Sequence, residues 1–141
     1  MTALSFVDSN ILVYADDCSA GAKRDRAWEL IRELLRNKAG ALLLQVLQEY
    51  FAVATRKLGI SAAGARRRVE LLNRLDVVIL GVSDLLAAID LHRLHGLSIW
   101  DTLIVRAALK AGCGVLYSED LQDGRRFDGL EVVNPFTAAE G

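Results

Sequence analysis

The sequence predicts an α/β sandwich around a mostly parallel sheet, with strands joined by right-handed crossovers. Short apolar runs alternate along the whole chain with longer segments in which apolar residues recur at helical spacing. Such short apolar runs are typical of strands that are buried on both faces. With 141 residues, 52% of them hydrophobic, the chain has the size and the core-forming capacity of one domain. We therefore expect residues 1–141 to form a single domain.

The first half of the chain is expected to contain two strands and three helices. Its longest helix has apolar residues on one face, and Gly40 ends it because glycine favours the turn past a helix C-terminus. The strands are expected at residues 3–7 and 42–44, and the helices at residues 10–15, 22–37 and 46–58.

The second half continues the alternation with three helices and three strands. Ser61, Ser83 and Ser98 each precede a helical segment and are suitable N-caps. The helices are expected at residues 62–75, 83–96 and 98–111, and the strands at residues 77–80, 115–117 and 131–133.

Four acidic residues lie at or near the ends of the predicted strands. Asp8 directly follows the first strand, and Asp120 follows the fourth by a few residues. Glu49 lies early in the helix after the second strand, and Asp101 lies in the first turn of the helix before the fourth. Ligands of open α/β sheets bind beyond the carboxyl ends of the strands. If the first and fourth strands are neighbours, these carboxylates can converge on one pocket.

Clustered carboxylates raise one another's pKa unless cations neutralise them. A set of hard oxygen ligands without His or Cys suits Mg²⁺ or Mn²⁺ rather than zinc. Such a metal site suits phosphoryl chemistry, in which the cation activates water and stabilises the leaving oxygen.

Each acid also has a purely structural explanation. Asp8 can cap the helix that follows it, and Asp101 stands at capping-box spacing from Ser98. Glu49 can be an ordinary half-exposed helix residue, and Asp120 lies in a polar run where Asp is a common turn residue. Only their joint placement near strand ends indicates a site.

Composition excludes several classes of protein. The net charge of −1 does not suit a protein that binds nucleic acid through a basic domain, although a local basic rim around a metal centre is compatible with it. Cys18 and Cys113 fit neither a disulfide framework nor a metal spacing. No apolar stretch is long enough for a membrane span and no signal peptide is evident, so a reduced, cytoplasmic location is expected.

Four segments in a fixed order resemble the motifs of PIN domains, in particular the VapC-type toxins of bacterial toxin–antitoxin pairs. They are Phe-Val-Asp-Ser-Asn, Gln-Glu-Tyr, Ser-Ile-Trp-Asp-Thr-Leu-Ile and Leu-Tyr-Ser-Glu-Asp-Leu-Gln-Asp-Gly, and the closing Val-Val-Asn-Pro-Phe resembles the family as well. The resemblance extends from Phe6 to Phe136. It implies a three-layer α/β/α sandwich with a central parallel sheet in strand order 3-2-1-4-5, which places the first and fourth strands side by side.

The resemblance also assigns roles to individual residues. Asp8, Glu49, Asp101 and Asp120 match the four catalytic and metal-binding acids of the family. Three further residues would support them: Asn10, Ser118, which would orient a carboxylate or a metal-bound water, and Asp123, a possible outer ligand. Glu119 has the wrong phase if Asp120 points inward, so it is left out of the site.

The implied function is Mg²⁺- or Mn²⁺-dependent endonucleolytic cleavage of RNA, leaving a 5′-phosphate and a 3′-hydroxyl. The implied partners are the RNA substrate, a small antitoxin protein and a second copy of the chain. Arg125 and Arg126 follow the expected active-site loop and could contact RNA phosphates. The run Arg66 to Arg68 is better explained as a solvated helix face.

Two other functions compete with this interpretation. A catalytically silent PIN-like module that binds proteins would not need all four acids, yet all four are present. A phosphoacceptor receiver domain would need an acidic pair after the first strand, an Asp after the middle strand and a late Lys. The third strand is followed here by Gly81 and Val82, and no Lys lies beyond Lys110.

Overall fold

The computed structural model describes residues 3–137, and its centre is one sheet of six strands. The strand order is β3-β2-β1-β4-β6-β5, and every neighbouring pair is parallel except β5 with β6. Because β6 is the fifth strand that the sequence predicts, the expected order 3-2-1-4-5 and the adjacency of β1 and β4 are confirmed. The strands are β1 (Ser5–Val7), β2 (Gly40–Leu43), β3 (Asp76–Val78), β4 (Val115–Tyr117), β5 (Arg126–Phe127) and β6 (Leu130–Val133).

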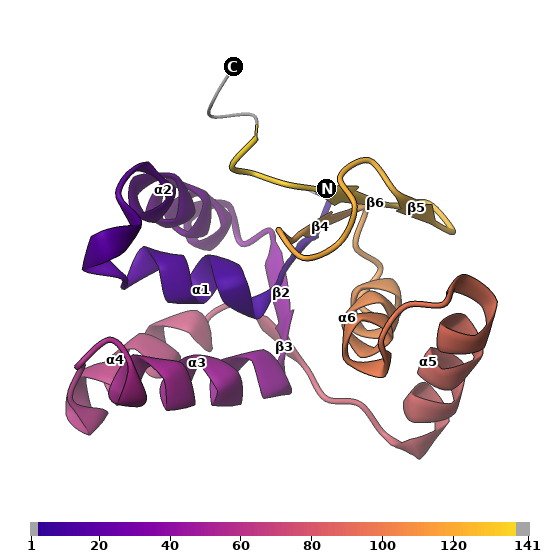
Figure 1. Cartoon of the computed structure of the whole chain (residues 1–141), viewed down its shortest axis with the longest axis horizontal. Helices are drawn as coiled ribbons and strands as arrows, with labels where there is room; N and C mark the ends of the chain where they lie inside the picture. The colour runs from indigo at the N-terminus through magenta and orange to yellow at the C-terminus, as the bar shows by residue number, and fades with distance from the viewer. Residues whose placement is uncertain (1–2, 138–141) are drawn as a thin grey trace.

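Helices cover the sheet on both sides, as Figure 1 shows: α1 to α4 lie on one side, and α5 and α6 on the other. This is the α/β arrangement that the alternation of strands and helices predicts. The helices are α1 (Ser9–Ala15), α2 (Ala22–Asn37), α3 (Leu44–Arg56), α4 (Ala62–Leu72), α5 (Val82–His95) and α6 (Ile99–Lys110), with a short 3-10 helix at Cys18–Ala20.

The central strands carry the core of the molecule. Phe6 of β1, Leu42 of β2 and Leu116 of β4 are fully buried. All four residues of β2 are buried, which requires cover on both faces of the sheet. The residues at the carboxyl ends of these strands are therefore attached to the buried core of the molecule.

Strand β5 is absent from the sequence-based expectation, in which Arg125 and Arg126 follow the active-site loop. It forms a two-residue antiparallel hairpin with β6. Asp128 and Gly129, which join the two strands, have φ angles of 45° and 86°. An Asp-Gly pair with positive φ at both positions is the preferred two-residue hairpin turn.

Two predicted helix ends are wrong. Gly81, not Ser83, caps α5, and the side chain of Asp84 accepts a hydrogen bond from the Gly81 N–H (3.0 Å). Lys38, not a glycine, ends α2 in the left-handed conformation (φ 51°). Gly40 instead lies in β2, where a Cβ would come within 2.9 Å of the Leu75 side chain, so close packing explains the glycine.

Other boundaries differ by two or three residues. Helix α3 begins at Leu44 because the chain turns into it directly after β2. Helix α4 ends at Leu72, and β3 is Asp76–Val78 rather than 77–80. Ile79 and Leu80 therefore belong to the connection between β3 and α5.

None of the helices in residues 3–137 is long and apolar enough to cross a membrane.

Candidate functional site

The carboxyl ends of β1 and β4 meet at one edge of the sheet. Val7 pairs with Tyr117, and the Asp8 N–H donates to the Tyr117 carbonyl (3.1 Å). The next residue of each strand is therefore Asp8 on one chain segment and Ser118 on the other. They are 110 positions apart in the sequence but adjacent in space.

Asp8 is buried and held by two hydrogen bonds. Its Oδ1 accepts from the Ser9 N–H (2.7 Å), so Asp8 is the N-cap of α1, as the sequence suggested. Its Oδ2 accepts from the Ser118 hydroxyl (2.8 Å), a buried contact that helix capping does not explain. Both oxygens are thereby fixed in direction.

Burial raises the pKa of Asp8 from 3.8 to about 6. The hydrogen bonds from Ser118 and Ser9 lower it in part, whereas the negative charges of Asp120 and Asp101 raise it further. Asp120 and Asp101 are therefore the two predicted acids whose charges act on Asp8.

Asp120 lies in the turn that follows β4. Its N–H donates to the Ser118 hydroxyl oxygen (3.2 Å), and its side chain is exposed. The Ser118 hydroxyl thus accepts from the backbone of one acid while it donates to the carboxylate of another.

Asp101 lies in the first turn of α6. Its N–H donates to the Ser98 hydroxyl (3.1 Å), which is one half of the expected capping box. Within residues 3–137 the Asp101 carboxylate itself accepts no hydrogen bond, so the reciprocal half of the box is not formed. Its half-buried side chain is therefore not committed to capping the helix.

Glu49 lies on the exposed side of α3. Its Oε1 accepts from the Gln45 side-chain amide one turn earlier (3.1 Å). It is not among the charges that raise the pKa of Asp8. Of the four acids, Glu49 is the one that the structure does not link to Asp8.

No three acidic, His or Cys side chains of the described residues lie close enough together to hold a metal ion. The available donors are nevertheless of one kind, because carboxylate oxygens dominate this edge of the sheet. Exposed Glu49 and half-buried Asp101 can change rotamer, while Asp8 is fixed.

Two supporting residues have different surroundings. Both amide atoms of Asn10 are buried and have no hydrogen-bond partner among the described residues. An unpartnered buried amide is costly and is therefore a sign of a missing ligand, ion or water. Asp123, by contrast, accepts from the Asn134 N–H (2.8 Å) and thus fastens its loop to the segment after β6.

Both candidate RNA-binding arginines belong to the β5 hairpin and its approach. The guanidinium of Arg125 lies over the Phe127 ring (5.1 Å to its centroid), and exposed Arg126 forms a long ion pair with Glu131 (3.5 Å).

The basic run Arg66 to Arg68, which was expected to be a solvated helix face, is only partly solvated. Arg66 pairs with Glu70 on the helix surface. Half-buried Arg68 instead donates to both carboxylate oxygens of Asp16 (3.0 and 2.8 Å).

Beside the acids, Glu119 forms contacts that the sequence does not indicate. Glu119 accepts from the Tyr14 hydroxyl and from the Lys23 ammonium, each at 2.7 Å. Its side chain is half-buried, whereas that of Asp120 is exposed. No local sequence signal announces the contacts, because the partners are about 100 positions away.

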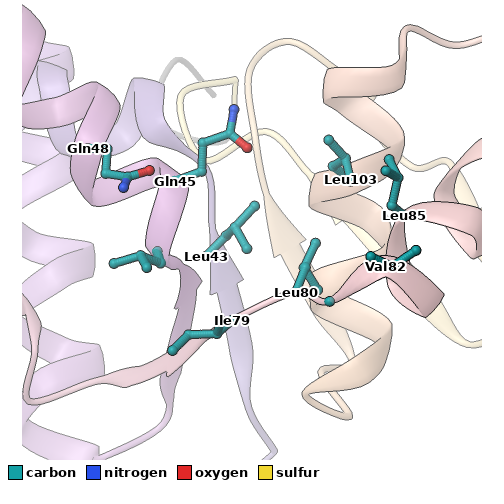
Figure 2. Close-up of a pocket in the computed structure, with 10 residues that line it drawn as sticks. Leu43, Gln45, Gln48, Ile79, Leu80, Val82, Leu85 and Leu103 are labelled. Atoms are coloured by element: carbon teal, nitrogen blue, oxygen red, sulfur yellow. The ribbon is translucent and has the colours of Figure 1, made fainter.

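An apolar groove lies beside this edge of the sheet. Figure 2 shows Gln45 and Gln48 of α3 across from Leu85 of α5 and Leu103 of α6. The cavity has a volume of about 450 Å³, and its lining contains no charged residue: Leu43, Leu44, Gln45, Gln48, Ile79, Leu80, Gly81, Val82, Leu85 and Leu103. Ile79 and Val82 are 67% and 74% exposed, which is unusual for large apolar side chains that lie together.

Comparison with known proteins gives a family and a set of similar folds. The family model described as "PIN domain" matches residues 5–129. A comparison with curated protein sequences finds no match.

Three solved structures share the fold at low sequence identity. A toxin-antitoxin complex from Klebsiella pneumoniae has a TM-score of 0.69 at 19% identity, covering 93% of this chain and 97% of that chain. The sarcin-ricin loop cleaving toxin VapC20 of Mycobacterium tuberculosis has a TM-score of 0.64 at 19% identity, with 82% and 89% covered. VapBC2 from Rickettsia felis, bound to a DNA fragment from its promoter, has a TM-score of 0.64 at 20% identity, with 92% and 96% covered.

Proposed function

We propose, from the premise that this chain belongs to the PIN domain family, that it is a Mg²⁺- or Mn²⁺-dependent endoribonuclease and the toxin of a toxin–antitoxin pair. The single observation that carries the proposal is the buried Asp8 carboxylate, which Ser118 fixes from the neighbouring strand at the carboxyl edge of the sheet. The similar folds of proteins described as toxins support it.

The residues at this edge fit a hard divalent cation. Asp8 is a buried carboxylate whose pKa is raised by burial and by the charges of Asp120 and Asp101, and a cation would relieve that repulsion. The buried amide of Asn10, unpartnered within the described residues, offers a further oxygen. Bound Mg²⁺ or Mn²⁺ would supply a water of lowered pKa and stabilise the charge that develops on the phosphodiester.

Each residue of the proposed site then has a defined role. Asp8 is the fixed ligand, because Ser118 and Ser9 hold its two oxygens in direction. Asp101, Asp120 and Glu49 would be the further ligands of the cation. Arg125 and Arg126 are placed on the hairpin beyond this loop to contact phosphates of the RNA.

Replacing Asp101 by Asn tests the proposal. We expect cleavage of RNA by the wild type in Mn²⁺ or Mg²⁺, no cleavage in EDTA, and a loss of about 100-fold or more in the variant, the scale expected when a group that stabilises developing charge is removed. Asp25→Asn is a matched control, because Asp25 also lies in the first turn of a helix but in α2. Thermal unfolding of both variants shows whether they remain folded.

Full activity of Asp101→Asn, or activity of the wild type that persists in EDTA, would refute the metal-dependent mechanism. Binding of a protein partner without any cleavage by the wild type would favour the silent PIN-like module instead.

The apolar groove of Figure 2 is proposed to take an apolar segment of the antitoxin. Its uncharged lining suits an apolar peptide and not the phosphates of RNA. It also borders the site, because Gln45 lines the groove and donates to Glu49. Toxin–antitoxin complexes among the similar folds support a protein partner. A homodimer is the second assembly that we propose.

A further inference from the structure

Three consecutive residues after β4 have different environments. Ser118 is buried and donates to Asp8, and exposed Asp120 donates its N–H back to Ser118. Between them, Glu119 bonds to the Tyr14 hydroxyl and to the Lys23 ammonium. The three residues are therefore held by different partners, Ser118 by Asp8 and Glu119 by Tyr14 and Lys23.

The contacts of Glu119 come from two helices. Tyr14 lies near the end of α1, and Lys23 lies in the first turn of α2. We call Glu119, Tyr14 and Lys23 the Glu119 clamp. It ties the turn after β4 to the helices on one side of the sheet.

Aromatic packing keeps the clamp in place. The Tyr14 ring meets the Phe136 ring edge-on, with centroids 5.1 Å apart. The Lys23 ammonium lies over both rings, 4.9 Å from the centroid of Tyr14 and 5.5 Å from that of Phe136. Lys23 is therefore held by two rings and a carboxylate together, unlike an isolated surface ion pair.

The electrostatics of the three groups agree with this geometry. The hydrogen bond from Lys23 lowers the pKa of Glu119, and the hydrogen bond from Tyr14 lowers it further. The same contact with Glu119 raises the pKa of Lys23. Both groups are thus ionised at neutral pH.

Helix α1 connects the clamp to the acidic edge. Asp8 caps its first residue, and Tyr14 extends from its last turn. The turn after β4 is consequently attached near both ends of α1, by Ser118 at Asp8 and by Glu119 at Tyr14. With both attachments in place, the turn has little freedom to rotate.

We propose that the Glu119 clamp is a positioning device that holds Ser118 against Asp8 and presents Asp120 to the same edge of the sheet. Glu119, Tyr14 and Lys23 do not touch a cation or RNA in this scheme; they act through Ser118 and Asp120. The consequence for cation binding rests on the proposed function, whereas the positioning itself does not.

Amide hydrogen exchange tests the positioning without reference to activity. Tyr14→Phe removes one hydroxyl and keeps the ring, and Lys23→Met removes the charge. We expect the Ser118 and Asp120 amides to exchange about tenfold faster in each variant, the scale of a lost charge-assisted hydrogen bond. Amides of α4 and α5 should keep their rates. Lys23→Arg retains the charge and should restore slow exchange.

Calorimetric titration with Mn²⁺ tests the consequence for the site. We expect the Kd of both clamp variants to rise about three- to tenfold, and that of Lys23→Arg to stay near the wild-type value. Glu70→Gln, which breaks the surface pair with Arg66 on α4, is the control and should leave both measurements unchanged.

Unchanged exchange at Ser118 and Asp120, or acceleration spread evenly over α4 and α5, would overturn the clamp as a positioning device. Faster local exchange with an unchanged Mn²⁺ affinity would overturn its role in the site. Absence of Mn²⁺ binding by the wild type would count against the proposed function, and the exchange measurement would still decide on the clamp.

Discussion

At the scale of single residues, the two carboxylate oxygens of Asp8 make contacts of different origin. Asp8 caps α1 with one oxygen and meets Ser118 with the other. The sequence presents only the first of these roles, because helix capping depends on neighbours along the chain. The second role depends on the adjacency of β1 and β4, which the family resemblance predicts and the strand order confirms.

The raised pKa of Asp8 predicts a pH-dependent stability of the cation-free protein. A carboxyl with a pKa of about 6 when folded and 3.8 when unfolded favours folding at low pH and loses that contribution as the pH rises through 6. The difference corresponds to about 3 kcal/mol. In EDTA, Asp8→Asn should therefore gain up to that amount over the wild type between pH 4 and pH 8, measured by urea unfolding. A stability difference that is the same at both pH values would contradict this assignment.

The other residues of the site were predictable to different degrees. Ser118 and Asp120 come directly after β4, which the sequence predicts, so their position at the carboxyl edge of the sheet could be predicted as well. The direction of Glu49 on α3 could not be inferred, since a half-exposed helix Glu has the same sequence context in or out of a site. The contacts of Glu119 with Tyr14 and Lys23 join distant parts of the chain and leave no local pattern.

At the scale of elements, helical periodicity and short apolar runs locate every α-helix of residues 3–137 and all strands but one, while the 3-10 helix at Cys18–Ala20 is not predicted. The exception, β5, is two residues long and lacks any alternation that could indicate a strand. The Asp128-Gly129 pair was its available signal, because an Asp-Gly pair between apolar residues favours a tight hairpin. Helix ends were less predictable: the Gly81 N–H at the start of α5 donates to Asp84, and the same carboxylate also accepts from Arg106 and Lys110 of α6.

Asp84 fastens α5 to α6. This buried carboxylate accepts from Arg106 (3.1 and 3.0 Å) and from Lys110 (2.8 Å), as well as from the Gly81 N–H. The hydrogen bond from Lys110, followed by those from Gly81 and Arg106, holds its pKa well below the ordinary value of 3.8.

A depressed carboxyl pKa contributes stability above the ordinary value and loses it as the pH falls towards the folded value. Asp84→Asn should therefore lower the urea midpoint clearly at pH 7, and the gap from the wild type should narrow below pH 3.8. Asp90→Asn, an exposed position on the same helix, should change little. A gap that stays constant from pH 7 to pH 3 would show that Asp84 acts through packing alone.

At the scale of the whole molecule, the polar and apolar features are separated. Asp8, Ser118 and the Glu119 clamp lie at the carboxyl edge of β1 and β4, while the uncharged groove runs between α3 and the α5–α6 pair (Figure 2). An acidic edge and an apolar groove side by side suit two different partners, a phosphodiester with its cation and a protein segment. The net charge of −1 is compatible with this division, because attraction of RNA depends on local groups.

The groove predicts how the proposed antitoxin is bound. Leu85 lines it, whereas Leu94 lies on the same helix, is 76% exposed and is not part of the lining. With the proposed antitoxin as the partner, Leu85→Arg should weaken binding and inhibition of RNA cleavage about tenfold or more, as at an interface hot spot. Leu94→Arg should have no such effect.

Light scattering of the free protein should give about twice 15.4 kDa, the mass of a homodimer. If Leu85→Arg instead splits that dimer and leaves antitoxin binding intact, the groove joins two copies of the chain and the antitoxin binds elsewhere.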